Sequence, residues 1–283
     1  MIEEQKIIAV PSDQLLPMQC YVQPFWKHSD IEIYNESNLD TMGRMPDSCI
    51  DLTVTSPPYD NLRKYKGYSF DFENIAKELY RVTKPGGVLV WVVGDSVVNG
   101  SETLTSFKQA IYFQSIGFNI HDTMIYAKEN PIPLTHNRYE QQFEYMFVFS
   151  KGKPKTFNGI YEKTNGGIAH YNAKTKEAAA RRNNEKIKVK DRRLKYNIWE
   201  YCVSNNDNTL HPAPFPEKLA ADHIYSWSNE GDLVYDCFGG SGTACKMAHL
   251  QNRKCIMSEM SREYCEISVK RITPYVLQQR MSF

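Results

Sequence analysis

Along most of the chain, short apolar runs alternate with stretches whose apolar residues recur every three or four positions. In residues 72–82 the apolar positions follow a spacing close to i, i+3, i+4 and i+7, which predicts a helix with one buried face. Residues 88–93 are apolar throughout, as is typical of a strand in the middle of a parallel sheet, covered on both faces. Between them, Lys84-Pro85-Gly86-Gly87 predicts a helix stop followed by a turn.

The same patterns predict the remaining elements. Further strands are expected at 31–34, 50–55, 118–126, 143–149, 233–236 and 254–258, and further helices at 102–116, 216–227, 243–250 and 262–271. Strand and helix alternate throughout. This order predicts an α/β fold with a mostly parallel sheet, helices on both faces and right-handed crossovers.

The composition is that of a folded chain without a membrane span. Of 283 residues, 41% are hydrophobic, and 34 Lys and Arg nearly balance 33 Asp and Glu, so the chain can bury enough surface to offset its conformational entropy. This length allows one large domain, or one domain with a sizeable insertion. The longest apolar run, 88–93, is far short of the roughly 20 residues that cross a bilayer, and residues 1–10 lack the pattern of a secretion signal. We therefore expect a cytoplasmic protein with no membrane contact.

The cysteines point to neither a metal site nor a disulfide framework. There are seven, they form no CxxC pair, and one would be left over if the others were bridged. We expect reduced thiols and no bound metal. The cysteines are Cys20, Cys49, Cys202, Cys237, Cys245, Cys255 and Cys265.

The near-zero net charge hides a strongly basic segment. Residues 151–200 hold 14 Lys and Arg against 5 Asp and Glu, so the rest of the chain is net acidic. Within this segment, residues 174–196 favour a helix by composition but show little apolar periodicity. Such a run is either a solvated helix or charged loop, or a face that binds nucleic acid by releasing counterions from phosphates. The charge run alone leaves both alternatives open.

A glycine-rich turn lies between the expected strand 233–236 and the expected helix 243–250. It reads Asp236-Cys237-Phe238-Gly239-Gly240-Ser241-Gly242-Thr243, and its three glycines allow positive φ and a close approach of a ligand to the backbone. Its spacing differs from the GxGxxG fingerprint, the P-loop and the GxSxG elbow. Glu259 follows about 17 residues later, where a carboxylate can accept hydrogen bonds from both ribose hydroxyls. A nucleoside cofactor is therefore favoured over a tight turn alone.

A second turn, Ser56-Pro57-Pro58-Tyr59, ends the expected strand 50–55. Two prolines remove two N–H donors and fix φ, so the chain leaves the sheet as a rigid tip. The Ser56 hydroxyl and the Pro57 carbonyl are then adjacent acceptors, which suit an exocyclic amino group with two N–H bonds to donate. The Tyr59 ring offers a face on which a base can stack.

Together these motifs resemble the S-adenosylmethionine-dependent amino methyltransferases of DNA. The Thr55-Ser56-Pro57-Pro58-Tyr59 run is similar to their catalytic motif in the form usual for cytosine-N4 enzymes, and residues 236–244 are similar to their cofactor loop, with Cys237 in place of a common proline. Residues 81–95, 139–154, 211–220 and 256–272 also resemble family motifs in order and spacing. One departure is Asn35-Glu36-Ser37-Asn38, which stands where the family often has an acidic residue soon after the first strand.

The resemblance carries expectations about fold and partners. A catalytic motif ahead of a basic segment and a cofactor loop is the order of the β class, a circular permutation of the Rossmann-like methyltransferase fold. It implies a catalytic domain of residues 1–150 and 201–283, with a target-recognition insertion at 151–200. It also implies S-adenosylmethionine as cofactor, a cytosine flipped out of double-stranded DNA as substrate, and a monomer or homodimer that needs no physical contact with a restriction endonuclease.

The same resemblance assigns roles to individual residues. The implied catalytic residues are Ser56, Pro57, Pro58 and Tyr59. The implied cofactor-binding residues are Phe215, Asp236, Phe238, Gly239, Gly240, Ser241, Gly242, Thr243 and Glu259. The implied nucleic-acid-binding residues are Lys174, Arg181, Arg182, Lys186, Lys190, Arg192 and Arg193.

Three alternatives stay open from the sequence. An adenine-N6 enzyme would use the same amine chemistry, although its motif more often begins with Asp or Asn where Ser56 stands. A non-catalytic subunit is disfavoured because both motifs are intact. An RNA methyltransferase is a further possibility that the basic segment does not distinguish from a DNA enzyme.

Overall fold

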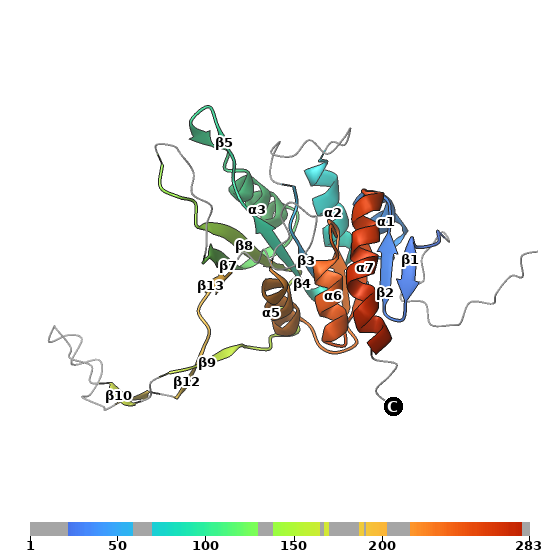
Figure 1. Ribbon diagram of the computed structural model, residues 1–283. Helices are drawn as coiled ribbons and strands as arrows, with labels where there is room; N and C mark the ends of the chain where they lie inside the picture. The colour runs from blue at the N-terminus through green and yellow to red at the C-terminus, as the bar shows by residue number, and fades with distance from the viewer. Residues whose placement is uncertain are drawn as a thin grey trace, which may run out of the picture.

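The computed structural model describes residues 22–58, 70–129, 138–164, 167–169, 187–189, 191–202 and 216–278. A nine-stranded sheet forms its centre, with the order β1-β2-β15-β14-β3-β4-β8-β7-β13 (Figure 1). β8 is antiparallel to both of its neighbours and β1 is antiparallel to β2, whereas every other adjacent pair is parallel. The strands are β1 (Trp26–His28), β2 (Ile31–Tyr34), β3 (Ile50–Thr55), β4 (Thr83–Val93), β7 (Asn119–Lys128), β8 (Phe143–Ser150), β13 (Ile198–Tyr201), β14 (Leu233–Asp236) and β15 (Lys254–Ser258).

Helices cover both faces of the sheet (Figure 1). One face carries α1 (Asn38–Arg44), α2 (Phe72–Val82) and α3 (Thr105–Ser115), and the other carries α5 (Glu217–Trp227), α6 (Thr243–Leu250) and α7 (Arg262–Gln278). Along β4, Val90 packs with side chains of α5 and α6, whereas Trp91 packs with those of α2 and α3. The alternation confirms that 88–93 is a central strand buried on both sides. In the part of the chain that the structure describes, none of the helices combines the length and apolar composition that a bilayer crossing requires.

The strand order reverses between β14 and β3. The chain runs outward from β3 through β4 to β7 on one side, and from β14 to β15 on the other. These two strands pair in parallel, with Leu52 opposite Val234 and Thr53 opposite Tyr235. In an open parallel sheet, ligands bind beyond the carboxyl ends of the strands at such a reversal. The expected α/β fold is confirmed, and it brings the ends of β3 and β14 side by side.

Three elements differ from the expected bounds by three or more residues at one end. β4 begins at Thr83 rather than at residue 88, because the Lys84-Pro85-Gly86-Gly87 run forms a bulge within the pairing of β3 with β4. α3 begins at Thr105 rather than near residue 102, because a short hairpin of β5 (Val97–Val98) and β6 (Ser101–Glu102) precedes it. α7 continues to Gln278, beyond the expected end at residue 271 and past Pro274.

The basic segment forms short strand pairs where the structure describes it. β9 (Tyr161–Lys163) pairs with β12 (Arg192–Leu194), and β10 (Gly167–Ala169) pairs with β11 (Ile187–Val189). The helix expected over 174–196 is therefore wrong for 187–189 and 192–194, because cross-strand pairing overrides the local helix propensity there. The segment leaves the sheet after β8 and returns through β13, and Figure 1 shows it as an arm that projects away from the sheet.

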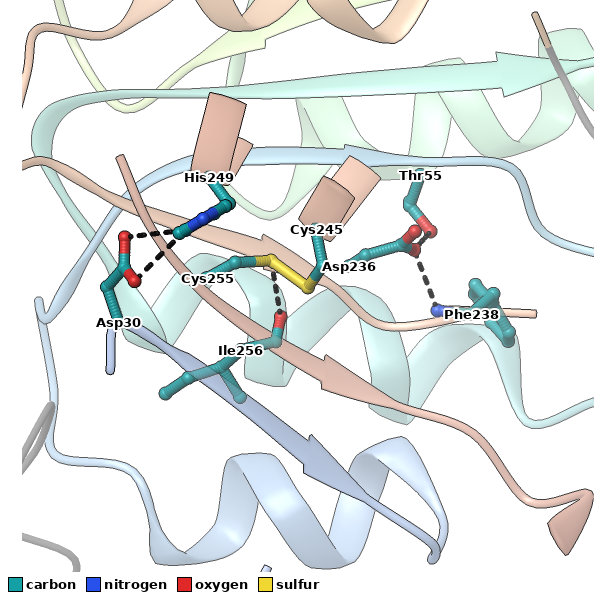
Figure 2. Close-up of a disulfide and its surroundings, with 8 residues drawn as sticks. All are labelled: Asp30, Thr55, Asp236, Phe238, Cys245, His249, Cys255 and Ile256. Carbon is teal, nitrogen blue, oxygen red and sulfur yellow. Dashed lines mark hydrogen bonds and ion pairs between the residues drawn. A yellow bond between two sulfur atoms is a disulfide. The ribbon is translucent and has the colours of Figure 1, made fainter. Parts of the chain in front are cut away.

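Cys245 on α6 and Cys255 on β15 form a disulfide, with their Cα atoms 5.3 Å apart (Figure 2). The expectation of reduced thiols is wrong for this pair. Two residues separated by 10 positions meet because α6 packs back onto β15, and a search for closely spaced cysteine pairs does not reveal such a contact. Free thiols are present at Cys49, Cys237 and Cys265, and Cys20 lies outside the described residues.

Candidate active site

A buried carboxylate joins the two turns that the sequence singles out. Asp236, the last residue of β14, accepts a hydrogen bond at Oδ1 from the Thr55 hydroxyl at 2.7 Å (Figure 2). The same oxygen accepts the backbone N–H of Phe238 at 3.1 Å. Because Thr55 immediately precedes Ser56, the proline-rich tip and the glycine turn share one anchor.

The environment of Asp236 disfavours its ionised form. Burial raises the pKa of this carboxyl from 3.8 to about 7, and the charge of Glu259 adds to the rise, although the hydrogen bonds from Thr55 and Phe238 act in the opposite direction. Near neutral pH the carboxyl at the junction of the two turns therefore exchanges between charged and neutral forms.

The glycines of the glycine turn are required by packing and by backbone geometry. Gly242 starts α6 at φ 77°, and a Cβ there would lie 2.9 Å from the Cβ of Ser268. A Cβ on Gly239 would lie 2.4 Å from Cε of Met257, and Gly240 has φ 49°. The room that these glycines leave is thus filled partly by the protein's own side chains, from β15 and α7.

Glu259 lies directly after β15 and holds the glycine turn. Its Oε2 accepts the backbone N–H of Gly240 at 2.9 Å, and its Oε1 accepts the backbone N–H of Ser261 at 2.7 Å. Burial raises the pKa of this carboxyl. Each carboxylate oxygen has two lone pairs, so both oxygens retain capacity for a hydroxyl donor. This arrangement fits the nucleoside cofactor expected from the sequence.

Two asparagines after β2 support the same turn, and the sequence reading did not assign them a role. The side-chain amide of Asn38 donates to the carbonyl of Cys237 at 3.1 Å. The amide of Asn35 donates to the carbonyls of Glu259 and Met260 at 3.0 and 2.9 Å. In the sequence, the signal for these two residues was that 35–38 departs from the resembled family, which often has an acidic residue soon after the first strand. In this chain the corner fixes the backbone on both sides of the proposed cofactor position.

A charged network supports the turn from behind. Arg271 Nη1 donates to the carbonyl of Ser241 at 2.7 Å, to the Ser241 hydroxyl at 2.8 Å and to the Thr243 hydroxyl at 3.2 Å. Glu217 Oε1 lies 2.8 Å from Arg271 Nη2 and 2.6 Å from Lys246 Nζ. The network connects the start of α5 with α6 and α7, so three helices fix the conformation of the turn.

The structure brings most of the described site residues together at the carboxyl ends of β3, β14 and β15. Ser56 and Pro58 are half-buried and Pro57 is buried, at the end of β3. Phe238 is half-buried, with its ring centroid 5.7 Å from that of Phe70 and 6.1 Å from that of Trp91. Outside the described residues lie Tyr59, Lys174, Arg181, Arg182, Lys186, Lys190 and Phe215.

The described arginines of the basic arm are not at this end of the sheet. Arg192 and Arg193 are exposed on β12, and Arg193 contacts Glu162 at 3.3 Å and lies 4.0 Å from the ring centroid of Tyr196. The arm leaves the sheet after Ser150. Ser150 pairs with Val88, at the start of the buried run of β4, whereas the candidate site lies beyond the other end of that strand. A role in DNA binding therefore requires contact away from the catalytic turn. Among the described residues, no group of three or more His, Cys, Asp or Glu side chains is placed to hold a metal ion.

Comparison with known proteins agrees with this geometry. The sequence profile of a DNA methylase family, the N6/N4 methyltransferases, matches residues 50–270. The chain is 54% identical over 250 residues to the orphan methyltransferase M.BamHII of Bacillus amyloliquefaciens, a match that covers 83% of this chain and 93% of the relative. It is 25% identical to the type II methyltransferase M.BglII of Bacillus subtilis, covering 84% of this chain and 67% of the relative.

Solved structures share the fold. The PvuII DNA methyltransferase (cytosine-N4-specific) superposes with a TM-score of 0.66 at 22% identity, covering 90% of this chain and 94% of the other. The complex of M1.HpyAVI with SAM superposes with a TM-score of 0.60 at 24% identity, covering 85% and 99%. The profile match spans most of the chain, including both turns and the strands that join them, and this protein belongs to the N6/N4 family of DNA methylases.

Proposed function

We propose that this protein methylates the exocyclic N4 amine of cytosine in double-stranded DNA, with S-adenosylmethionine as methyl donor. Membership of the N6/N4 DNA methylase family supports DNA methylation. Ser56 supports the cytosine-N4 type, because Asp or Asn more often begins the motif in the adenine-N6 enzymes that the chain resembles. The fold likeness to an enzyme described as cytosine-N4-specific, and to one bound to SAM, agrees with both parts of the proposal.

The observation that carries the proposal is the hydrogen bond between Thr55 and Asp236. It fixes Thr55, the residue before Ser56, against Asp236, the first residue of the glycine turn, at 2.7 Å between oxygen atoms. A methyl donor held by one turn and an amine held by the other would then meet within the same crevice, which is the main requirement for transfer between two bound molecules.

The residues of the glycine turn fit an adenosyl group. Glu259 would accept the ribose hydroxyls on its remaining lone pairs, and the half-buried Phe238 ring would pack against the cofactor. When bound, S-adenosylmethionine supplies an electrophilic methyl group on a sulfonium, which is an excellent leaving group. Asp236, Glu259 and the supporting helices would orient that methyl group towards the end of β3.

Ser56 and Pro57 would prepare the acceptor amine. The lone pair of an aromatic amine is delocalised into the ring, so the nitrogen is a weak nucleophile. Hydrogen bonds from its two N–H groups to Ser56 Oγ and the Pro57 carbonyl would favour tetrahedral geometry and aim the lone pair at the methyl carbon. The new N–C bond forms as the S–C bond breaks, and the surplus proton of the amine passes to solvent. Tyr59 would stack on the extruded base.

The test is to identify the modified nucleoside. We would incubate the protein with DNA and S-adenosylmethionine carrying an isotopically labelled methyl group, digest the DNA and analyse the nucleosides by mass spectrometry. Labelled N4-methylcytosine is expected, and Ser56→Ala should lower its yield roughly 100-fold while cofactor still binds. Labelled N6-methyladenine alone would contradict the cytosine assignment. Label in neither nucleoside would contradict methyl transfer to DNA.

A further inference from the structure

The short hairpin after β4 is built as a rigid projection. β5 and β6 pair with Val97 opposite Glu102 and Val98 opposite Ser101, and the two residues between the strands, Asn99 and Gly100, have φ of 51° and 78°. Positive φ at both central residues of a two-residue connection is the type I′ geometry, which matches the twist of the strands and fixes their register.

Contacts at its base anchor the β5–β6 hairpin to the start of α3. The Asp95 carboxylate, between β4 and β5, accepts the backbone N–H of Ser106 at 2.8 Å and its hydroxyl at 2.5 Å. The backbone N–H of Thr103 donates to the carbonyl of Ser96 at 2.9 Å. Arg138, ahead of β8, donates to the carbonyl of Gly100. The hairpin is therefore held at both its base and its turn.

The hairpin exposes apolar side chains. Val97 and Val98 are 48% and 55% exposed, and Leu104, directly after β6, is 47% exposed. Leu104 also has φ 53°, a left-handed conformation that is unfavourable for a residue with a bulky side chain. Strands of two residues are too short to be stable alone. An anchored, strained and apolar projection of this kind indicates a binding role.

The β5–β6 hairpin lies at the end of the sheet formed by the carboxyl termini of β3 and β4, which also carries the candidate active site. β4 is the parallel neighbour of β3, with Thr55 opposite Trp91, and it continues in the same direction to Val93 before the hairpin begins. Figure 1 shows the hairpin projecting beyond this edge, while the basic arm leaves from the other side of the sheet. The hairpin is therefore placed to reach a duplex whose target base lies beside the end of β3.

The exposed Lys108 beside the hairpin favours DNA over an apolar protein partner. Lys108 and Arg138 are exposed beside the hairpin, and Lys108 Nζ lies 2.9 Å from the carbonyl of Thr103. An exposed lysine beside an apolar tip suits the two kinds of surface of a duplex, its phosphates and its stacked bases. Glu102, the acidic residue of the hairpin, lies 3.9 Å from Arg138, which partly offsets its charge.

We propose that the β5–β6 hairpin is a wedge that enters duplex DNA beside the target base, with Val98, next to the turn, occupying the space that the extruded base leaves. This inference rests on the proposed function and deepens it, by naming the element that holds the duplex open. Extrusion breaks base stacking and pairing, and apolar side chains inserted between base steps compensate for the lost stacking.

The test compares two duplexes of the same sequence, once the methylated position has been mapped. In one the target base is paired, and in the other it is mispaired and so already destabilised. For the double variant Val97→Ser with Val98→Ser, kcat/KM on the paired duplex should fall about tenfold or more, and on the mispaired duplex it should stay within about twofold of wild type. Ile111→Ser, a similar change at an exposed position of α3 further from the hairpin, is the matched control and should leave both values unchanged.

Equal losses on both duplexes, or a loss on neither, would overturn the wedge. A lower sedimentation mass of the double variant, with kcat/KM on the paired duplex unchanged, would also overturn the wedge. The hairpin would then serve the association of two copies of the chain. If the wild-type protein methylates neither duplex, the proposed function fails separately. Fluorescence of duplexes that carry 2-aminopurine at successive positions then still tests the wedge, since the double variant should bind them without the rise in fluorescence that wild type produces at the extruded position.

Discussion

Replacing Thr55 with valine tests the link between the two turns at its most direct point. The side chain keeps its shape and its preference for strand, but loses the hydroxyl that donates to Asp236 Oδ1 at 2.7 Å. Asp236 is buried, and among the described residues its Oδ1 then keeps the backbone N–H of Phe238 at 3.1 Å as donor. A hydrogen bond to a neutral group contributes about 1 kcal/mol to stability, and one to a charged group about 1.5–3 kcal/mol.

The loss should therefore depend on pH. The Thr55 hydroxyl favours the ionised form of Asp236, whose pKa is raised to about 7 by burial. Below pH 7 the carboxyl is mostly neutral, so the variant should lose about 1 kcal/mol of unfolding free energy. Above pH 7 it is mostly ionised, so the loss should grow to about 2 kcal/mol. Urea denaturation of wild type and variant at pH 6 and pH 8.5, without cofactor, measures both values.

Thr53→Val is the matched control. Thr53 lies two residues earlier on the same face of β3 and is fully buried, yet its hydroxyl finds no hydrogen-bond partner among the residues that the structure describes. Removing it should leave stability unchanged or raise it by up to about 1 kcal/mol at both pH values, since no bond is lost and a buried polar group is removed. Equal effects of the two substitutions, or a loss at Thr55 that does not grow with pH, would refute the assigned role of the Thr55–Asp236 bond.

Three further outcomes are expected. Gly242→Ala should lower the unfolding free energy by about 2–4 kcal/mol and weaken cofactor binding, because φ is 77° and the new Cβ would lie 2.9 Å from the Cβ of Ser268 on α7. Gly43→Ala is the control, since Gly43 lies in helix α1 with open space around it, and it should be neutral or stabilising. Thermal denaturation of both variants measures the difference. Burial lowers the pKa of His223 to about 3, so stability is lost as pH falls from 6.5 towards 3, where the imidazole is protonated in the unfolded chain but neutral in the folded one. His223→Leu should therefore flatten the fall in melting temperature over that range. An unchanged slope of melting temperature against pH would contradict this. Glutamine at both Arg192 and Arg193 should reduce the slope of log Kd against log salt by about 2, and an unchanged slope would remove the arm from the DNA interface.

Local patterns in the sequence determined the elements and the chemistry of their ends. The continuous apolar run at 88–93 specified a central strand. A strand with apolar side chains on both faces is stable mainly where other elements cover both faces. The prolines at 57 and 58 and the glycines of the turn at 239–242 specified where strands must end and where the backbone must bend. These are effects of neighbouring residues, so they are visible without a fold.

Only the tertiary structure decided which distant residues meet. The hydrogen bond from Thr55 to Asp236 joins residues 181 positions apart, and the disulfide of Cys245 with Cys255 depends on how α6 packs on β15. Composition favoured helix in the basic segment, but its described parts pair as strands and leave the sheet on the side away from the crevice. The physical reason is the same in each case. Pairing and packing between remote segments outweigh propensities of well under 1 kcal/mol per residue, and no local pattern encodes which partner a segment will find.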